Sequence, residues 1–131
     1  MGTDIVHILP TEKTPEFLLN SDGFIKIKGR GLMLNETKVP EKIMTWTDLY
    51  LKHPAKITHV IIAFEYLNSF STIILVTLLK KLSQVTQQGK KLVIHWYYEP
   101  DDFDLLERGE YVLTAIKHPI EFICTDDITN K

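Results

Sequence analysis

Four polar side chains stand together in the stretch FEYLNSFSTIILVTLLKKL, where an apolar run typical of a strand gives way to one typical of a helix. They are Asn68, Ser69, Ser71 and Thr72. Amide and hydroxyl groups at this spacing could cap a helix, supply a nucleophilic serine, bind a phosphate or receive a phosphoryl group. These four chemistries differ in what the rest of the chain must supply.

Catalysis and nucleotide binding need further groups at fixed spacing. A nucleophile elbow requires glycine two residues on either side of its serine, whereas Leu67 and Ser71 flank Ser69. A P-loop is excluded because its glycines and its lysine are missing. No motif sets any of the five histidines beside a serine, and none of them has metal-ligand spacing, so no metal is expected. A small hydrolase that uses Ser69 stays open as an alternative.

Capping by Asn68 or Ser69 accounts for one of the four polar residues and is worth about 1 kcal/mol. The other hydroxyls favour a side chain that is modified. A phosphoryl group on Ser69 would add about −1.5 to −2 charges at the positive end of a helix dipole. The fold would tolerate this charge, whereas a partner that docks there through apolar or acidic contacts would be expelled.

The composition is that of one globular domain, which we expect to span residues 1–131. Hydrophobic residues make up 44% of the chain, enough for a core, and the net charge of −2 gives no positive field that would attract nucleic acid. The single cysteine, Cys124, excludes an intramolecular disulfide and is expected to be buried in the run IEFICT. Because neither a secretory signal nor a membrane-spanning stretch is evident, we expect a cytoplasmic protein.

The first part of the chain predicts an antiparallel contribution to a sheet. Residues 5–9 and 24–30 have strand patterns, and we expect them to pair with each other. The polar stretch 11–23 between them is expected to be a connection that ends in the turn Ser21-Asp22-Gly23. A helix is predicted over 40–53, because Pro40 suits its first turn and an apolar stripe follows.

The rest of the chain alternates strand and helix patterns. Strands are expected over 57–67, 91–98 and 119–125, and helices over 69–88, capped by Gly89, and 100–118. Connections of this length fit parallel pairing. The strand over 57–67 is apolar on both faces, which predicts cover on both sides of the sheet. The predicted fold is α/β, with a mixed, mostly parallel sheet of about five strands and helices packed on it.

Aromatic and acidic residues follow the strand over 91–98 in the strip HWYYEPDDFD. Functional groups gather at the carboxyl ends of parallel strands, so this strip should lie near Ser69. Its residues could form a docking surface, or they could be core residues and partners of a helix dipole. In the glycine-rich turn GRG, the arginine could contact a phosphate or a partner. The candidate partner-binding residues are Asn68, Phe70, Trp96, Tyr98, Asp101, Asp102 and Arg30.

The segment YLNSFST and its surroundings resemble the SiaC-type regulatory phosphoproteins, whose fold is similar to the STAS-like domains of anti-sigma-factor antagonists. The matching pieces occur in the same order: IKGRGLMLNE, FEYLNSFS, LLKKL, GKKLVIHWYYEPDD, LLERGEYV and HPIEFI. They extend over roughly residues 24–126, which is most of the chain. The resemblance implies a STAS-like form of the predicted sheet.

In that family the turn reads Asn-Thr-Ser-Ser, and its Thr is phosphorylated by a dedicated kinase and dephosphorylated by a PP2C-type phosphatase. This Thr falls on Ser69, the next Ser falls on Phe70, and a Lys that is common in the family falls on Ile73. The resemblance therefore implies Ser69 as the phospho-acceptor. Ser71, which keeps its family identity, is the second choice and Thr72 the third.

The resemblance implies a non-enzymatic switch of a bacterial partner-switching pathway that needs no cofactor. Its unphosphorylated form would bind an effector, which in that family can be a diguanylate cyclase. The alternative is a STAS-like scaffold that binds its partner constitutively and is never phosphorylated. Phe70 and Ile73 favour the scaffold because they make the turn more apolar than the family's.

Overall fold

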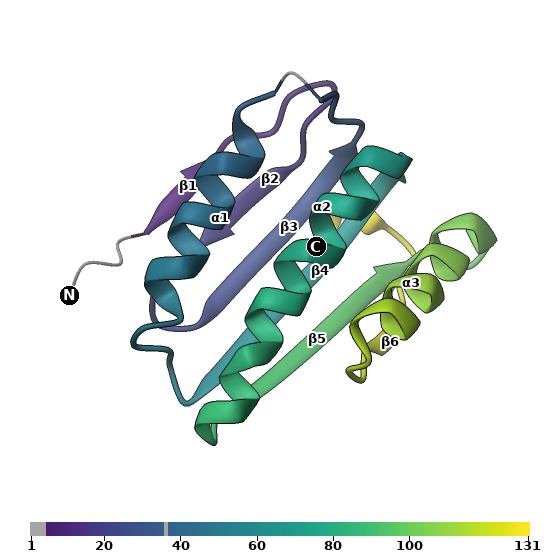
Figure 1. The fold of residues 1–131 in the computed structure, drawn as a ribbon. Coiled ribbons are helices and arrows are strands. Elements are labelled where there is room, and N and C mark those ends of the chain that lie inside the picture. The colour runs from purple at the N-terminus through teal and green to yellow at the C-terminus, as the bar shows by residue number, and fades with distance from the viewer. Residues whose placement is uncertain (1–4, 36) are drawn as a thin grey trace.

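The computed structural model describes residues 5–35 and 37–131, and within them six strands form one sheet in the order β1-β2-β3-β4-β5-β6 (Figure 1). The predicted α/β class is confirmed. The strands are β1 (Val6–Ile8), β2 (Glu16–Leu19), β3 (Phe24–Gly31), β4 (Ile57–Leu67), β5 (Lys91–Tyr98) and β6 (Glu121–Cys124). The α-helices are α1 (Val39–Tyr50), α2 (Ser69–Leu82) and α3 (Phe103–Ile116), and the 3₁₀ helices are η1 (Ser83–Gln88) and η2 (Ile128–Asn130).

The sheet is mixed and mostly parallel, as predicted. β1, β2 and β3 pair antiparallel, whereas the pairs β3–β4, β4–β5 and β5–β6 are parallel. Each parallel pair is joined through one α-helix. A short turn joins only antiparallel strands, so the chain must cross back over the sheet before it begins the next parallel strand. The carboxyl ends of β4 and β5 therefore lie at the same edge of the sheet, followed by α2 and α3 respectively.

The prediction that residues 11–23 form only a connection is wrong. Within this stretch Phe17 pairs with both Ile8 of β1 and Ile27 of β3, so a short strand separates the two that were expected to pair. Phe17 and Leu19 are buried and alternate with half-buried neighbours. This strand is only four residues long and polar turn residues surround it, which hides its alternation in the sequence.

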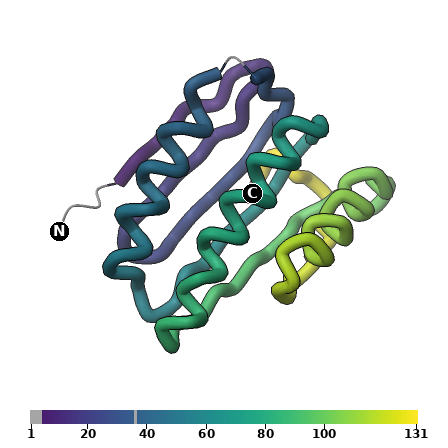
Figure 2. The backbone as a smooth tube through the Cα atoms, in the orientation of Figure 1, coloured from purple at the N-terminus to yellow at the C-terminus, as the bar shows by residue number. Residues whose placement is uncertain are grey.

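All three α-helices lie on one face of the sheet (Figures 1 and 2). Successive parallel strands add in one direction, and right-handed crossovers then pass over the same face. The 3₁₀ helix η2 packs against β4 on the other face, so the expected cover on both sides of this strand is confirmed. The same C-terminal segment brings Lys131 Nζ to 5.3 Å from the centroid of the Tyr97 ring.

Polar side chains cross the helix-free face of the sheet from β4 to β6. His59 Nε2 lies 3.0 Å from His95 Nδ1, and His95 Nε2 lies 2.9 Å from the Glu121 carboxylate. Burial and, to a smaller extent, the charge of His95 lower the pKa of His59 below its ordinary value. A hydrogen bond between the two rings requires at least one neutral ring, because protonation of both would leave no acceptor between them.

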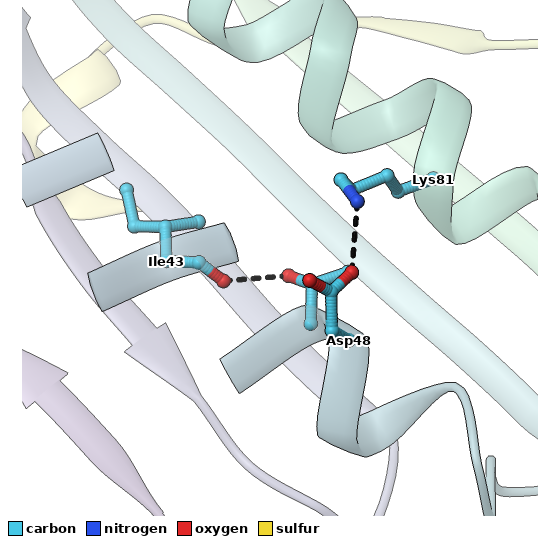
Figure 3. Close-up of polar contacts among 4 residues, drawn as sticks. Ile43, Asp48 and Lys81 are labelled. Carbon is cyan, nitrogen blue, oxygen red and sulfur yellow. Dashed lines mark hydrogen bonds and ion pairs between the residues drawn. The ribbon is translucent and has the colours of Figure 1, made fainter. Parts of the chain in front are cut away.

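Helices α1 and α2 are tied together at the surface by an ion pair (Figure 3). Lys81 Nζ of α2 lies 2.8 Å from Asp48 Oδ1 of α1, and both side chains are partly exposed. Such a pair contributes about 0–1 kcal/mol, so apolar packing holds the two helices. Below them Trp46 stacks on Tyr50, whose hydroxyl group hydrogen-bonds to Thr58 of β4 at 2.7 Å.

The helix predictions are confirmed with shorter bounds. The stretch predicted as one helix over 69–88 is α2 followed by η1, and Gly89 ends it in the left-handed conformation, with φ of 77°. α3 begins only at Phe103, because Asp102 is its cap. Cys124, which was expected to be buried, is exposed near the end of β6. No helix in the described ranges is long and apolar enough to cross a membrane.

We predict that Gly109→Ala destabilises the fold. A Cβ at this position of α3 would lie 2.5 Å from Phe122 Cε1 and 2.8 Å from Trp96 Cε2, so the helix or the rings must shift. Overpacking of this kind outweighs the gain in helix propensity, and we expect a net loss of about 1–2 kcal/mol. Urea denaturation followed by circular dichroism measures it, with Glu110→Ala on the exposed side as the control. A stabilised Gly109→Ala variant would contradict the close packing of α3.

Candidate functional site

Asn68 joins the end of β4 to the start of α2 and uses both ends of its amide group. Its Oδ1 accepts a hydrogen bond from the Ser71 backbone N–H at 2.8 Å, which makes Asn68 the helix cap. Its Nδ2 donates to the Met33 carbonyl oxygen at 3.0 Å. Of the two capping residues that the sequence allowed, the structure selects Asn68 and gives it a second task in holding the loop between β3 and α1.

The hydroxyl groups of Ser71 and Thr72 are also engaged. Ser71 Oγ accepts a hydrogen bond from the Met33 backbone N–H at 2.9 Å, and Thr72 Oγ1 donates to the Asn68 carbonyl oxygen at 2.7 Å. Ser71 is 1% exposed and Thr72 is 3% exposed. Three of the four polar residues in this cluster therefore have structural roles. Sequence reasoning missed the contact with Met33, because 38 residues separate it from Ser71.

Ser69 differs from its neighbours because it is exposed, and among the described residues its side chain makes no hydrogen bond. It is the first residue of α2, where the backbone N–H groups of the first turn face outward. Its hydroxyl group is thus accessible, and no hydrogen bond within the described part of the chain depends on it. Of the three candidate acceptors Ser69, Ser71 and Thr72, it is the one that can be modified without breaking a contact.

Ser69 lines a groove of about 980 Å³ between the end of β4, the start of α2 and one side of α3. Figure 1 shows these three elements next to one another at the carboxyl edge of the sheet. Its charged lining consists of four carboxylates and one guanidinium group, which makes it acidic. The charged residues are Glu65, Asp102, Asp104, Glu107 and Arg108.

Three large side chains on the rim of this groove are exposed: Tyr66 by 55%, Ile73 by 61% and Tyr111 by 60%. Clustered exposed apolar and aromatic side chains are typical of protein-binding surfaces. Sequence reasoning left these residues out, because helical periodicity does not say which side of α3 faces α2. One usable signal was present, since Tyr111 lies outside the buried stripe of α3.

Some predicted partner-binding residues do not reach this surface. The assignment of Trp96 is corrected, because its side chain is fully buried under α3 and contacts no solvent. Tyr98 and Phe70 are half-buried and pack against the core, so at most part of each ring is accessible. The alternative that Trp96 is a core residue, which the sequence had left open, is the correct one.

Arg30 is exposed but does not lie in a turn, as the sequence suggested. It belongs to β3, directly after a register shift at Gly29, whose φ is 115°. Its guanidinium carbon lies 5.6 Å from the centroid of the Tyr66 ring, which lines the groove. Arg30 is therefore beside the groove, and it makes a cation–π contact with one of the exposed aromatic residues.

The acidic residues after β5 divide between structural and free positions. Asp102 accepts a hydrogen bond from the Leu105 backbone N–H at 3.1 Å, as a helix cap does, and it also lines the groove. Asp101 is exposed and lines a second, smaller hollow of about 510 Å³ with Glu99. Glu99 accepts from the Ile128 backbone N–H at 2.9 Å. Within the described ranges, no group of three or more His, Cys, Asp or Glu residues could hold a metal ion.

No histidine is among the described residues that line the groove around Ser69. His59 and His95 form their pair on the helix-free face of the sheet. A serine nucleophile normally depends on such a base within hydrogen-bond reach. The surroundings of Ser69 therefore do not activate it for hydrolysis by a serine–histidine arrangement.

A mixed α/β domain that presents a free hydroxyl group in an open groove with an apolar rim has the features of a protein-binding regulatory domain. Residues 8–125 match the model of the SiaC family of regulatory phosphoproteins. The match covers most of the chain, and the chain therefore belongs to this family. No curated protein sequence matches it.

Solved SiaC structures share this fold. The chain is 20% identical to apo-SiaC from Pseudomonas aeruginosa, with a TM-score of 0.79, and the match covers 92% of this chain and 98% of that one. It is 19% identical to the SiaC of the same organism in a complex with the diguanylate cyclase SiaD. In that complex SiaC is the activator of SiaD. There the TM-score is 0.82, with 92% and 99% of the two chains covered. These similarities establish the fold.

We predict that Ser69→Ala and Ser71→Ala differ sharply in stability. Ser69→Ala removes no hydrogen bond and should change the free energy of unfolding by less than about 0.5 kcal/mol. Ser71→Ala leaves the Met33 backbone N–H buried without its acceptor and should cost about 1–3 kcal/mol. Chemical denaturation of both variants measures the difference. Equal losses would show that the start of α2 does not hold the Met33 loop as described.

Proposed function

We propose that this chain is a non-enzymatic, cytoplasmic switch that is phosphorylated on Ser69 by a dedicated kinase and dephosphorylated by a PP2C-type phosphatase. In its unphosphorylated form it binds an effector protein. The observation that carries the proposal is the state of Ser69, whose exposed hydroxyl group lines the groove and makes no hydrogen bond to residues 5–35 or 37–131. Membership of a family of regulatory phosphoproteins supports the same assignment.

Ser69 is a better acceptor than Ser71 or Thr72 for a physical reason. A kinase must bring the acceptor oxygen in line with the γ-phosphate of its nucleotide, so the hydroxyl group has to be accessible. The hydroxyl groups of Ser71 and Thr72 are buried, and each is hydrogen-bonded to a backbone group. Their modification would first require the start of α2 to open, whereas Ser69 needs no rearrangement.

A phosphoryl group on Ser69 would alter the groove in two ways. It would add about −1.5 to −2 charges next to outward-facing backbone N–H groups of α2, which tolerate an anion. It would also add that charge and bulk beside Tyr66 and Ile73, which are suited to apolar contact. A partner that buries these side chains would have to desolvate the phosphate, which is costly.

We propose that the effector is a diguanylate cyclase and that the groove forms part of the docking surface. The SiaC of Pseudomonas aeruginosa is the activator of such an enzyme, which supports the choice of effector class. The rim residues Tyr66, Ile73 and Tyr111 provide exposed anchors of the kind that dominate protein interfaces. No cofactor is needed for this role.

The second candidate is a scaffold that binds its partner constitutively. The 61% exposure of Ile73 favours it, because an apolar side chain beside Ser69 provides contact area that phosphorylation does not remove. The two candidates agree on the docking surface. They differ in whether a modification at Ser69 changes the affinity.

We predict that phosphoserine at position 69 weakens effector binding by at least about tenfold, equivalent to about 1.4 kcal/mol. The unmodified chain and a chain with genetically encoded phosphoserine at position 69 are titrated against the diguanylate cyclase of the same organism by calorimetry. The reason for the loss is the desolvation cost of the phosphate within the interface.

The matched control is phosphoserine encoded at position 77. Thr77 lies further along the same helix, is exposed and does not line the groove. Phosphoserine at position 77 adds the same charge to α2 and should leave the affinity for the effector near that of the unmodified chain. If phosphoserine at 69 and at 77 both bind as tightly as the unmodified chain, the switch is refuted and the constitutive scaffold holds. If no form binds, the assignment of the effector is wrong.

A further inference from the structure

The groove beside Ser69 contains one basic side chain among its described lining residues, that of Arg108. Arg108 belongs to α3 and is half-buried, whereas Ser69 begins α2 on the opposite side of the groove. α2 and α3 contact each other directly, so these two residues face a common space from two helices.

Arg108 is not committed to a carboxylate. Four acidic residues line the same groove, yet among the described residues the guanidinium group makes neither an ion pair nor a hydrogen bond. α2 offers no competing cation there, because Lys80 and Lys81 lie in its last turn and Ile73 occupies its groove side. A fixed positive charge is thus available to an anion that appears in the groove.

We propose that Arg108 is the phosphate-binding residue of the switch, and that it pairs with the phosphoryl group when Ser69 is phosphorylated. The ligand is a phosphomonoester dianion, and a guanidinium group binds it through two parallel hydrogen bonds. The inference rests on the proposed phosphorylation of Ser69. It adds a mechanism, because the pair would bridge α2 and α3 across the groove that Tyr66 and Tyr111 also line.

Arg108 is expected to bind the phosphate in preference to a neighbouring carboxylate because the phosphate carries more charge. A phosphate dianion presents more charge and three acceptor oxygens, while a carboxylate presents one charge and two oxygens. Asp102 is also engaged as the cap of α3. The four carboxylates that line the groove would repel a further anion. Without Arg108 the phosphate would therefore be poorly accommodated.

The test is a ³¹P NMR titration of the full chain carrying genetically encoded phosphoserine at position 69. A cation beside the phosphate favours the dianion, so Arg108 lowers the second pKa of the phosphate. We expect Arg108→Gln to raise this pKa by at least about 0.5 units relative to the phosphorylated wild-type chain. Arg108→Lys keeps the charge but loses the two-point contact, and should fall between them.

Arg30→Gln is the control, because Arg30 is exposed on β3 and contacts Tyr66 from outside the groove. It removes one positive charge nearby and should leave the phosphate pKa unchanged. Thermal melts of the unphosphorylated variants establish that each is folded. If Arg108→Gln fails this check, Arg108→Met, which also removes the charge but keeps an aliphatic side chain, is titrated in its place.

An equal phosphate pKa in the wild-type chain and the decisive Arg108 variant would overturn the proposal. An equal rise with Arg30→Gln would also overturn it, since the effect would then be one of net charge. Because the phosphoserine is encoded, this outcome is independent of any host kinase. If Arg108 does not affect the phosphate pKa, the proposal for Arg108 is refuted and phosphorylation of Ser69 is not. If the chain from its host carries no phosphate, the proposed function is refuted, and Arg108 loses its role in the switch whatever the titration shows.

Discussion

The site depends on how the buried backbone of Met33 is satisfied. Its carbonyl oxygen accepts from Asn68 Nδ2, and its N–H donates to Ser71 Oγ, so both polar groups find partners at the start of α2. A buried peptide group without partners would cost several kcal/mol, about 1–3 for each missing hydrogen bond. The requirement fixes Asn68 and Ser71 in place and joins the loop after β3 to the turn after β4.

The same requirement sets Ser69 apart. Once Asn68, Ser71 and Thr72 are engaged, one hydroxyl group of the cluster is left exposed, without a hydrogen bond to any residue that the structure describes. The topology supplies its surroundings, because crossovers on a single face bring α2 and α3 into contact. A groove with an apolar rim and an acidic lining forms beside the free serine. The neighbours of Ser69 are held by hydrogen bonds that do not involve its side chain. A phosphoryl group could therefore be added to Ser69 without breaking the contacts that hold the turn.

The sequence predicted long and strongly patterned elements well. The strands β4 and β5 occur at the expected positions, because β-branched runs between turn signals identify them. β2 was not predicted, because an alternating pattern over only four residues does not stand out from a polar connection. Cover on both sides of β4 was predicted, but its hydrophobicity does not reveal that η2 provides the cover on the face opposite the helices.

The sequence located the turn between β4 and α2 but not the contacts that surround it. Capping by Asn68 could be predicted because turn chemistry is local in sequence, whereas the role of Ser69 stays a prediction. The groove was not, since Tyr111 and Arg108 join it only when α3 packs beside α2. Trp96 was misassigned because an aromatic residue at a strand end reads equally well as a core residue or as a surface anchor. Long-range packing decides such cases, and no local pattern encodes it.

The most direct test of the account is intact-mass spectrometry with fragment mapping of the chain purified from its native host, before and after phosphatase treatment. The account predicts a form carrying one phosphate, located on Ser69 and removed by the phosphatase. Phosphate on Ser71 or Thr72 would contradict it, because those hydroxyl groups are buried and hydrogen-bonded in the folded chain. Absence of phosphate under every growth condition would leave a constitutive binding domain in place of a switch.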